Sequence, residues 1–365
     1  MATPIRRIIS ADSHVIEPVD LWERAVGKRL GDKCPRIIHD YLGKKGRYFY
    51  TGAQVLYIDD VDREVADKGL RECGFIPEKR IAFQDEAHIE AELMNATLML
   101  LIMQGEYKPA VRVAAQVYND WCQDFCAYAP KRLLGIAMIP MDDVEWAVAE
   151  LQRVARNGMR GAIINTQPPV GSPPYRDPVY DPFWAAAQDL DVPIALHIIT
   201  GRVPDPFHFH SPKEQDETIP LMLQLYYEAM TPVAADFIFG GILDRFPRFK
   251  LLCSEFEISW IPPFMYRLDQ MQGSFKARLP WLPTLKMAAS DYVRHRIWHG
   301  MIDDPLGREA IRHIGVDQVL WGSDFPHVRS IGLETQERVG KLFDGMASED
   351  QDKLVAGNVA RVFGL

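Results

Sequence analysis

A carboxylate and an imidazole lie two residues apart near the start of the chain, in Ile8-Ile9-Ser10-Ala11-Asp12-Ser13-His14. The apolar first part of this segment is typical of a buried strand. Because side chains alternate along an extended chain, Asp12 and His14 would share one face of that strand. Such a pair is half of a divalent-metal site. Taken alone, however, it favours an ordinary strand end with a turn-forming aspartate and a hydrogen-bonded histidine. Residues elsewhere in the chain must therefore distinguish a metal site from this alternative.

Two more side chains that can bind a metal follow or interrupt apolar segments later in the chain. His197 lies within Ile-Ala-Leu-His-Ile-Ile, and Asp324 follows the apolar segment 318–323. Alone, His197 is more typical of a core histidine and Asp324 of a turn. With Asp12 and His14 they supply two imidazoles and two carboxylates, which suit Zn²⁺ or Mn²⁺ better than a metal that prefers thiolates.

Other polar residues also follow apolar segments, where they would contact a substrate. We predict substrate contacts for Asn165, Arg202, His208, His299 and His327. Arg202 is the candidate partner of a second substrate carboxylate, because a planar guanidinium matches that group. His208 belongs to Pro-Asp-Pro-Phe-His-Phe-His, which we interpret as a lid or substrate-contact loop rather than as metal ligands. Each residue has a purely structural alternative, and we expect at least one of them to be structural.

Eight apolar strands, each followed by helical sequence, are predicted to position these side chains. They start at Ile8 and then cover 97–102, 133–139, 161–164, 193–199, 249–254, 296–301 and 318–323. Short strands that alternate with helices indicate parallel βαβ units. Eight such units favour an α/β fold of the closed (β/α)₈ TIM-barrel type over an open sheet. Active-site residues of these barrels lie at the carboxyl ends of the strands, which is where the candidates above fall.

The stretch between the first two predicted strands has no sustained period. Gly, Pro, Lys and aromatic residues mix from Gly31 to Ala91, apart from a possible hairpin formed by Tyr48–Tyr50 and Val55–Ile58. Long connections of this kind are usually functional. We therefore expect one barrel domain over residues 1–365, with residues 31–91 as an insertion after the first strand that acts as a lid.

Composition restricts the class of protein. The 365 residues carry a net charge of -9 without a basic block, so nucleic acid and anionic membranes are poor partners. Five cysteines without a Cys-x-x-Cys pair favour a reduced, intracellular setting. Neither a signal-peptide core nor a membrane-spanning run is visible, so we expect a cytoplasmic protein. Nucleotide-binding glycine motifs and the Gly-x-Ser-x-Gly elbow of serine hydrolases are missing from the sequence.

At this point the motifs resemble a known family. The matching segments are Ala11–Pro18, Leu196-His197, Gly240–Pro247, Ser254–Trp260, Arg267–Asp269 and Trp321–His327. Together they resemble the amidohydrolase superfamily, and most closely the amidohydrolase 2 group, which includes aminocarboxymuconate-semialdehyde decarboxylase and γ-resorcylate decarboxylase. The resemblance covers nearly the whole chain apart from the insertion.

This resemblance implies a (β/α)₈ barrel that binds one divalent metal ion at the strand ends through Asp12, His14, His197 and Asp324. The family's first motif is usually His-x-His or Glu-x-His, and here it starts with Asp12. The decarboxylases also carry a histidine after strand six, and by its spacing that position is Glu255 here. Members often form dimers or tetramers, so we expect a homodimer or homotetramer.

The resemblance implies a metal-dependent enzyme that acts on a small-molecule carboxylate. We place non-oxidative decarboxylation of an aromatic or dienoic acid first, with Asp324 or Glu255 protonating the substrate carbon. The alternative is hydrolysis of an ester, amide or ring-cleavage product, in which Asp324 takes the proton of metal-activated water. Replacement of the strand-six histidine favours this alternative. A non-catalytic metal-binding barrel is the third possibility, and the presence of all four ligand residues argues against it.

Overall fold

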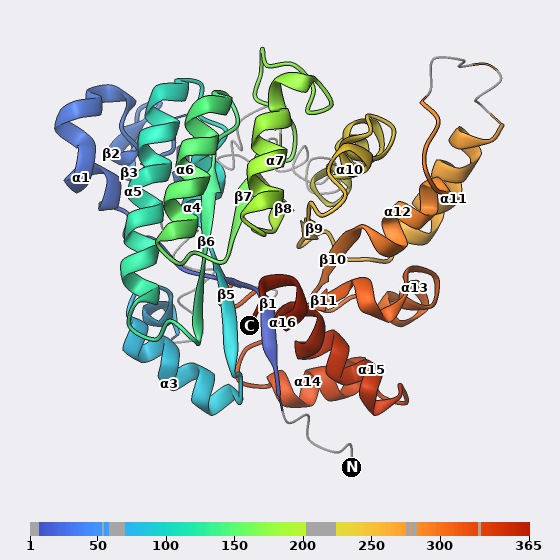
Figure 1. Cartoon of the computed structure of the whole chain (residues 1–365). Coiled ribbons are helices and arrows are strands. Elements are labelled where there is room, and N and C mark those ends of the chain that lie inside the picture. Colours follow the sequence, from blue (N-terminus) through green and yellow to red (C-terminus); the bar gives the residue numbers. More distant parts are fainter. Residues whose placement is uncertain are drawn as a thin grey trace.

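Eight parallel strands form the centre of the molecule, in the order β1-β5-β6-β7-β8-β9-β10-β11 (Figure 1). The computed structural model describes residues 7–52, 55–57, 70–201, 224–274, 278, 283–327 and 330–365. The eight strands are β1 (Ile9–His14), β5 (Ala91–Asn95), β6 (Leu133–Ile139), β7 (Gly161–Ile164), β8 (Ile194–His197), β9 (Leu251–Ser254), β10 (Ile297–Met301) and β11 (Val319–Trp321).

Residues just after β11 close this sheet onto β1. The Asp324 amide donates to the Asp12 carbonyl at 2.7 Å, and the His14 amide donates to the Phe325 carbonyl at 2.7 Å. The first and last strands are therefore linked at their carboxyl ends. The predicted barrel of the (β/α)₈ type is confirmed, with its last joint made by the segment that carries Asp324.

Helices cover the outside of the strands, as α5, α6 and α7 do in Figure 1. The helices of the described residues are α1 (Leu21–Leu30), α3 (Pro77–Ala87), α4 (Leu98–Ile102), α5 (Lys108–Cys126), α6 (Val144–Arg156), α7 (Asp181–Asp189), α9 (Met230–Pro232), α10 (Ile242–Arg245), α11 (Ile261–Gln272), α12 (Ala289–His295), α13 (Gly307–Ile314), α14 (Thr335–Leu342), α15 (Ser348–Asp352) and α16 (Asn358–Phe363). Two π-helical segments, η4 (Val233–Ile238) and η6 (Lys353–Gly357), and short 3₁₀ turns complete them. Their apolar faces pack against the strands, as their spacing in the sequence predicts.

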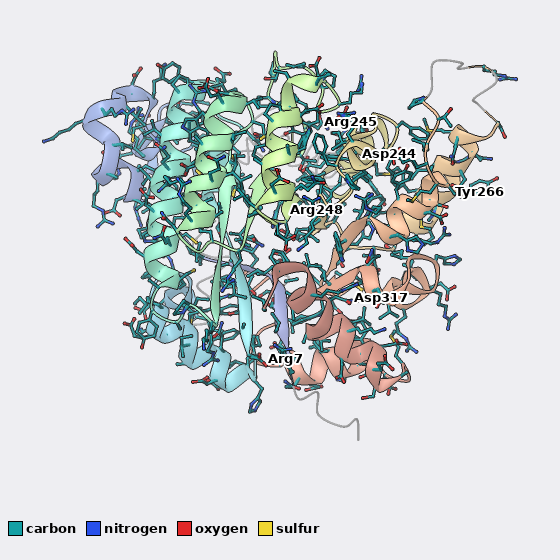
Figure 2. All side chains as sticks on the ribbon, in the orientation of Figure 1. Arg7, Asp244, Arg245, Arg248, Tyr266 and Asp317 are labelled. Atoms are coloured by element: carbon teal, nitrogen blue, oxygen red, sulfur yellow. The ribbon has the colours of Figure 1, made fainter. Side chains whose placement is uncertain are left out.

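Charged residues occupy the outer surface of this helical layer. Figure 2 labels Arg245 and Arg248 there, and they pair with Asp181 and Asp189 at 2.9 and 3.0 Å. Ion pairs this exposed contribute little stability. No helix of the described residues is both long and apolar enough to cross a membrane.

The second barrel strand is not the one predicted. Residues 97–102 form helix α4, and the strand is β5 at Ala91–Asn95. The prediction was wrong because a short apolar run does not distinguish a buried strand from a buried helix. A residue outside the run favours the helix. Buried Glu17 accepts the N–H groups of Thr97, Leu98 and Met99 at 3.2, 2.9 and 3.0 Å. These N–H groups have no partner within the helix, so Glu17 stabilises its first turn.

The insertion after β1 contains a small antiparallel sheet made of β2 (Arg36–Tyr41), β3 (Lys44–Tyr50) and β4 (Val55–Tyr57). Tyr50 pairs with Val55, so the expected hairpin is present; Ile58 lies outside the described residues. Helix α3 follows and packs near β1 and β5 (Figure 1). The insertion is confirmed, whereas its action as a lid stays a prediction.

Candidate metal centre

Four side chains from three strand ends converge within metal-binding distance. Asp12 and His14 come from β1, His197 ends β8, and Glu255 follows β9; one ligand atom of each lies within 4.8 Å of the others. The Nε2 atom of His14 is 3.3 Å from Asp12 Oδ1, and His197 Nε2 is 3.4 Å from Glu255 Oε2. Parallel strands bring these residues together because their carboxyl ends meet at one mouth of the barrel.

Backbone carbonyls fix both imidazole rings. His14 Nδ1 lies 2.6 Å from the Ala96 carbonyl, and His197 Nδ1 lies 3.0 Å from the Ile198 carbonyl. A carbonyl only accepts, so each Nδ1 carries the hydrogen and each Nε2 of a neutral ring carries a lone pair. Both Nε2 atoms are buried, and neither has a hydrogen-bond partner among the described residues. Two oriented lone pairs beside carboxylates fit a divalent cation.

Two other strands, β5 and β9, hold the Asp12 carboxylate. Its Oδ1 accepts from Asn95 Nδ2 at 2.6 Å, and its Oδ2 accepts from Ser254 Oγ at 2.9 Å. Burial opposes the charge of Asp12, but the adjacent imidazoles of His14 and His197 hold its pKa well below the ordinary value. Burial also lowers the pKa of His14. An ionised aspartate beside a neutral imidazole is the combination that binds a metal.

Asp324 and His327 also lie beside His14. Asp324 Oδ1 is 3.4 Å from His14 Nε2, and the rings of His14 and His327 are 4.4 Å apart. These three residues form a second group whose ligand atoms lie within 4.8 Å of one another. Burial lowers the pKa of His327 well below its usual value, so the ring is neutral. The carboxylates of Glu255 and Asp324 thus both lie within 4.0 Å of His14 Nε2, so either could reach a metal bound to this nitrogen.

Both of these carboxylates stand on strained backbone. Glu255 has φ 64° and Asp324 has φ 55°, in the left-handed region that residues other than glycine rarely adopt. The barrel-closing hydrogen bond from the Asp324 amide holds that turn in place. Strain of this kind collects at functional sites, because the surrounding structure must impose it.

A fully buried ion pair supports the β1 ligands from helix α3. Arg80 Nε donates to Glu92 Oε2 at 2.6 Å, and Arg80 Nη1 donates to the His14 carbonyl at 2.9 Å. Arg80 Nη2 lies 3.5 Å from the Phe325 carbonyl. One guanidinium therefore contacts the segments that carry His14 and Asp324. Sequence reasoning missed this pair, although Glu92 is the one charged residue in the buried strand Ala-Glu-Leu-Met-Asn and was a usable signal.

Only some of the predicted substrate residues that the structure describes lie beside the metal centre. His327 lies beside the centre, as described above. The Asn165 amide instead joins two backbone segments, accepting from Met141 N at 3.3 Å and donating to the Met103 carbonyl at 3.2 Å. His299 Nε2 lies 3.2 Å from the Val293 carbonyl in α12, so the ring faces the helical layer. Arg202 and His208 lie outside the described residues.

A pocket of about 250 Å³ adjoins the centre, and we call it the acidic pocket. It is lined by Tyr226, Glu255, Glu257, Ile302, Asp303 and Asp324. It shares Glu255 and Asp324 with the two ligand groups, so a molecule inside it would reach the metal. The Glu257 carboxylate accepts the N–H groups of Ile302 and Asp303 at 3.0 and 3.3 Å.

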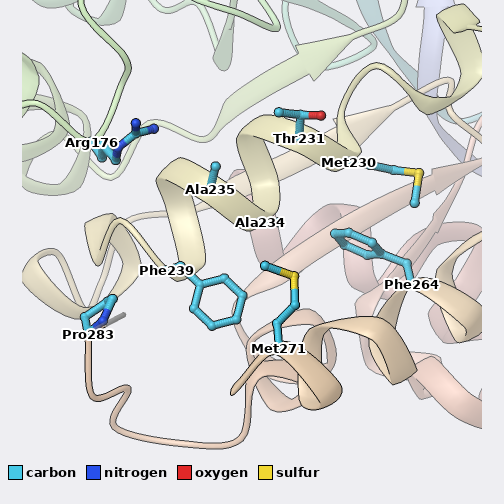
Figure 3. A pocket seen from close by; sticks show the side chains of 9 residues that line it. All are labelled: Arg176, Met230, Thr231, Ala234, Ala235, Phe239, Phe264, Met271 and Pro283. Carbon is cyan, nitrogen blue, oxygen red and sulfur yellow. The ribbon is translucent and has the colours of Figure 1, made fainter. Parts of the chain in front are cut away.

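A larger hollow of about 640 Å³ lies between η4 and α11 and shares no residue with the centre (Figure 3). Its lining is mostly apolar, including Met230, Phe239, Phe264 and Met271. Arg176, its cation, pairs with Asp236 at 2.7 Å. Among the described residues, its lining includes no group of candidate metal ligands.

Comparison with known proteins identifies a family and related enzymes. A family model described as amidohydrolase matches residues 57–365. The γ-resorcylate decarboxylase of Rhizobium radiobacter is 26% identical over 307 residues, which cover 80% of this chain and 88% of the relative.

Solved structures share the fold. An amidohydrolase from Mycobacterium avium subsp. paratuberculosis has a TM-score of 0.76 at 19% identity, over 99% of this chain and 100% of that one. The 5-carboxyvanillate decarboxylase of Novosphingobium aromaticivorans, complexed with manganese and 4-hydroxy-3-methoxy-5-nitrobenzoic acid, has a TM-score of 0.72 at 19% identity, over 98% and 96% of the two chains. At these identities the structural similarity establishes the barrel fold alone. The reaction has to be inferred from the residues of the site.

Proposed function

This chain belongs to the amidohydrolase family, and we propose that it is a metal-dependent decarboxylase of small aromatic or dienoic carboxylic acids. The observation that carries the proposal is the pair of buried Nε2 lone pairs of His14 and His197, held beside carboxylates at the barrel mouth. The names of the decarboxylases that the chain resembles support the reaction.

We propose that Asp12, His14 and His197 hold one divalent ion, with the carboxylates of Glu255 and Asp324 close to His14 Nε2. When bound, such an ion supplies a Lewis acid that fixes the substrate carboxylate and polarises an adjacent oxygen. Imidazole and carboxylate ligands suit Mn²⁺ and Zn²⁺. The manganese bound by the Novosphingobium relative supports Mn²⁺ as the first metal to test.

Asp324 would supply the proton. Its side chain is 4% exposed and adjoins the acidic pocket, so a proton on it is sheltered from bulk water. Transfer of that proton to the ring carbon forms a C–H bond, and cleavage of the bond to the carboxylate then releases CO₂. Asp324 regains a proton from solvent. Glu255 is the second candidate donor, since its side chain borders the same pocket.

Hydrolysis is the second candidate function. The observation that favours it is Glu255, a carboxylate at the position of the decarboxylases' strand-six histidine, facing His197 at 3.4 Å. In this reaction Asp324 would take a proton from the attacking water and pass it to the leaving group. The acid or base role of Asp324 is thus common to both reactions, and the substrate distinguishes them.

Product analysis in D₂O tests the two reactions. The Mn²⁺-loaded protein is incubated with hydroxybenzoates, and separately with aryl esters. We expect CO₂ release and one deuterium at the vacated ring carbon. Ester cleavage without CO₂ release from any acid would replace the decarboxylase by a hydrolase. If neither reaction occurs in a protein that retains its metal, the non-catalytic barrel is the better description.

A further inference from the structure

Three serine hydroxyls lie together in the buried joint between β1 and the segment after β11. Ser13 Oγ is 2.9 Å from Ser10 Oγ and 2.8 Å from Ser323 Oγ. All three side chains are fully buried, where a hydroxyl without a partner is costly. Ser10 donates to the Asp12 carbonyl at 2.8 Å and accepts the Ser323 amide hydrogen at 2.9 Å. The three hydroxyls therefore join the backbone of β1 to the segment that carries Asp324.

A carboxylate fixes the direction of the hydrogen bonds among these hydroxyls. Ser13 Oγ lies 2.9 Å from Glu92 Oε1, and Arg80 Nε donates to the other oxygen of Glu92 at 2.6 Å. An ionised carboxylate only accepts, so Ser13 gives its hydrogen to Glu92. The Ser13 oxygen then accepts from Ser323, whose own oxygen accepts from the Phe325 amide at 3.2 Å. We call Ser10, Ser13, Ser323 and Glu92 the serine network.

The backbone on both sides of Asp324 is bonded to this network. The Ser323 amide donates to Ser10 Oγ and the Phe325 amide to Ser323 Oγ, while the Asp324 amide itself donates to the Asp12 carbonyl. Three consecutive N–H groups are thus bonded to buried acceptors. Asp324 has φ 55°, a conformation that persists in a residue other than glycine only where its surroundings impose it. Since the backbone fixes the direction of the Cα–Cβ bond, these contacts also direct the carboxylate.

We infer that Ser13 and Ser323 are positioning residues, which hold the Asp324 carboxylate at the barrel mouth through the serine network. This role rests on the proposed function, in which Asp324 transfers the proton, and it applies to decarboxylation and hydrolysis alike. Both side chains are fully buried and both hydroxyl hydrogens are used within the network, so neither residue contacts a substrate. The network ends at the ion pair of Glu92 with Arg80, whose charges orient the hydroxyls.

The kinetics of Ser323→Ala test this role. The change removes one oxygen and leaves every candidate metal ligand in place. We expect kcat of the Mn²⁺-loaded full-length protein to fall about 10- to 100-fold, because a small displacement of a reacting group has an effect of this size. KM and metal content should stay near those of the wild type. Ser290→Ala on α12 is the matched control, because Ser290 is also buried and its hydroxyl accepts from Arg294 at 2.9 Å.

Two double variants show whether the hydroxyls act through Asp324. In the Asp324→Asn background, where proton transfer is already lost, Ser323→Ala should cause no further fall in kcat. Ser13→Ala combined with Ser323→Ala should be no slower than Ser323→Ala alone, since both changes interrupt the same network. A fall in kcat that is equally large in both backgrounds, or additive losses from the two serines, would overturn the inference.

Hydrogen exchange measures the same contacts without turnover. The amides of Asp324 and Phe325 are bonded to buried acceptors, and mass spectrometry of a peptide that contains them reports their exchange. We expect exchange about tenfold faster in Ser323→Ala than in the wild type, and unchanged exchange in Ser290→Ala. A thermal melt checks that each variant folds. Unchanged exchange in a folded Ser323→Ala protein would overturn the inference.

The outcomes separate this inference from the proposed function. CO₂ release by the wild type with an equal kcat in Ser323→Ala would uphold the decarboxylase and overturn the positioning role. If the wild type converts neither acids nor esters, the decarboxylase falls, while faster exchange in Ser323→Ala alone would still support the hold of the serine network on Asp324.

Discussion

At the scale of single residues, the centre depends on which nitrogen of each imidazole carries a hydrogen. The carbonyls of Ala96 and Ile198 settle this for His14 and His197, because each carbonyl takes the Nδ1 hydrogen and leaves Nε2 for a cation. The neighbouring strand β5 likewise holds Asp12 through Asn95 Nδ2. Each ligand is therefore oriented before a metal arrives, which a catalytic site requires.

Asp324→Asn tests proton transfer at this scale. We expect kcat to fall about 10²- to 10⁴-fold, because an amide cannot exchange the proton. Metal content should stay near that of the wild type, since Asp12, His14, His197 and Glu255 remain. Steady-state CO₂ release and elemental analysis of the same samples measure both quantities. An unchanged kcat with the metal retained would remove Asp324 from the mechanism.

His299 makes a prediction about pH. Burial lowers its pKa from 6.5 to about 4, so between these values the unfolded chain binds a proton that the folded chain does not. Stability therefore falls as the pH drops below about 6.5, by about 2 kcal/mol at pH 5 for this residue. Urea unfolding at pH 7.5 and pH 5 should show a smaller pH dependence in His299→Gln than in the wild type. Equal pH dependence in the two proteins would be the contrary result.

At the scale of elements, α3 connects the insertion to the barrel. Arg80 reaches the ends of both β1 and the segment after β11, so a helix outside the sheet fixes the two segments that carry His14 and Asp324. The Phe83 ring of the same helix stacks on Phe325 at 3.7 Å. The insertion thus helps to position two segments that carry residues of the candidate site.

A double-mutant cycle measures this connection. Arg80→Met alone leaves Glu92 charged and buried, and we expect it to lower the free energy of unfolding by about 3–5 kcal/mol. Glu92→Leu should cost a similar amount. The double variant should be more stable than either single variant, because no unpaired charge remains. Denaturant titration gives all four values; strictly additive losses would mean that the two groups do not interact.

Elements show where prediction from sequence succeeds. β6 and β7 fall at 133–139 and 161–164 as predicted, because each is a pure apolar run between clear loops. β5 was missed because Glu92 interrupts its pattern, and the Arg80 that neutralises it lies in another element. The convergence of Asp12, His14 and His197 could be predicted, because all three lie near the carboxyl ends of predicted parallel strands. The approach of Glu255 to His197 depends on left-handed backbone, which no local pattern reveals.

At the scale of the whole molecule, the barrel is closed by the segment that carries its candidate acid. The Asp12 carbonyl accepts from the Asp324 amide, and the His14 amide donates to the Phe325 carbonyl. A cation that binds side chains of β1, β8 and the β9 end would link strands far apart in the sequence. Metal binding and barrel stability should therefore be coupled.

Removal of the metal tests this coupling. At free metal about 1,000-fold above its dissociation constant, binding adds about 4 kcal/mol to the free energy of unfolding. We expect chelation to lower the melting temperature of the wild type and to leave that of His197→Ala unchanged. An identical response of both proteins to the chelator would show that the ion stabilises the fold elsewhere.

The metal content of the purified full-length protein, measured beside that of His197→Ala after both are loaded with Mn²⁺, tests the central claim most directly. We predict about one equivalent in the wild type and a large loss in the variant, whose fold is checked by circular dichroism. If both proteins stay metal-free after loading, or retain equal amounts, the centre formed by Asp12, His14, His197 and Glu255 is not a metal site and the proposed chemistry falls with it.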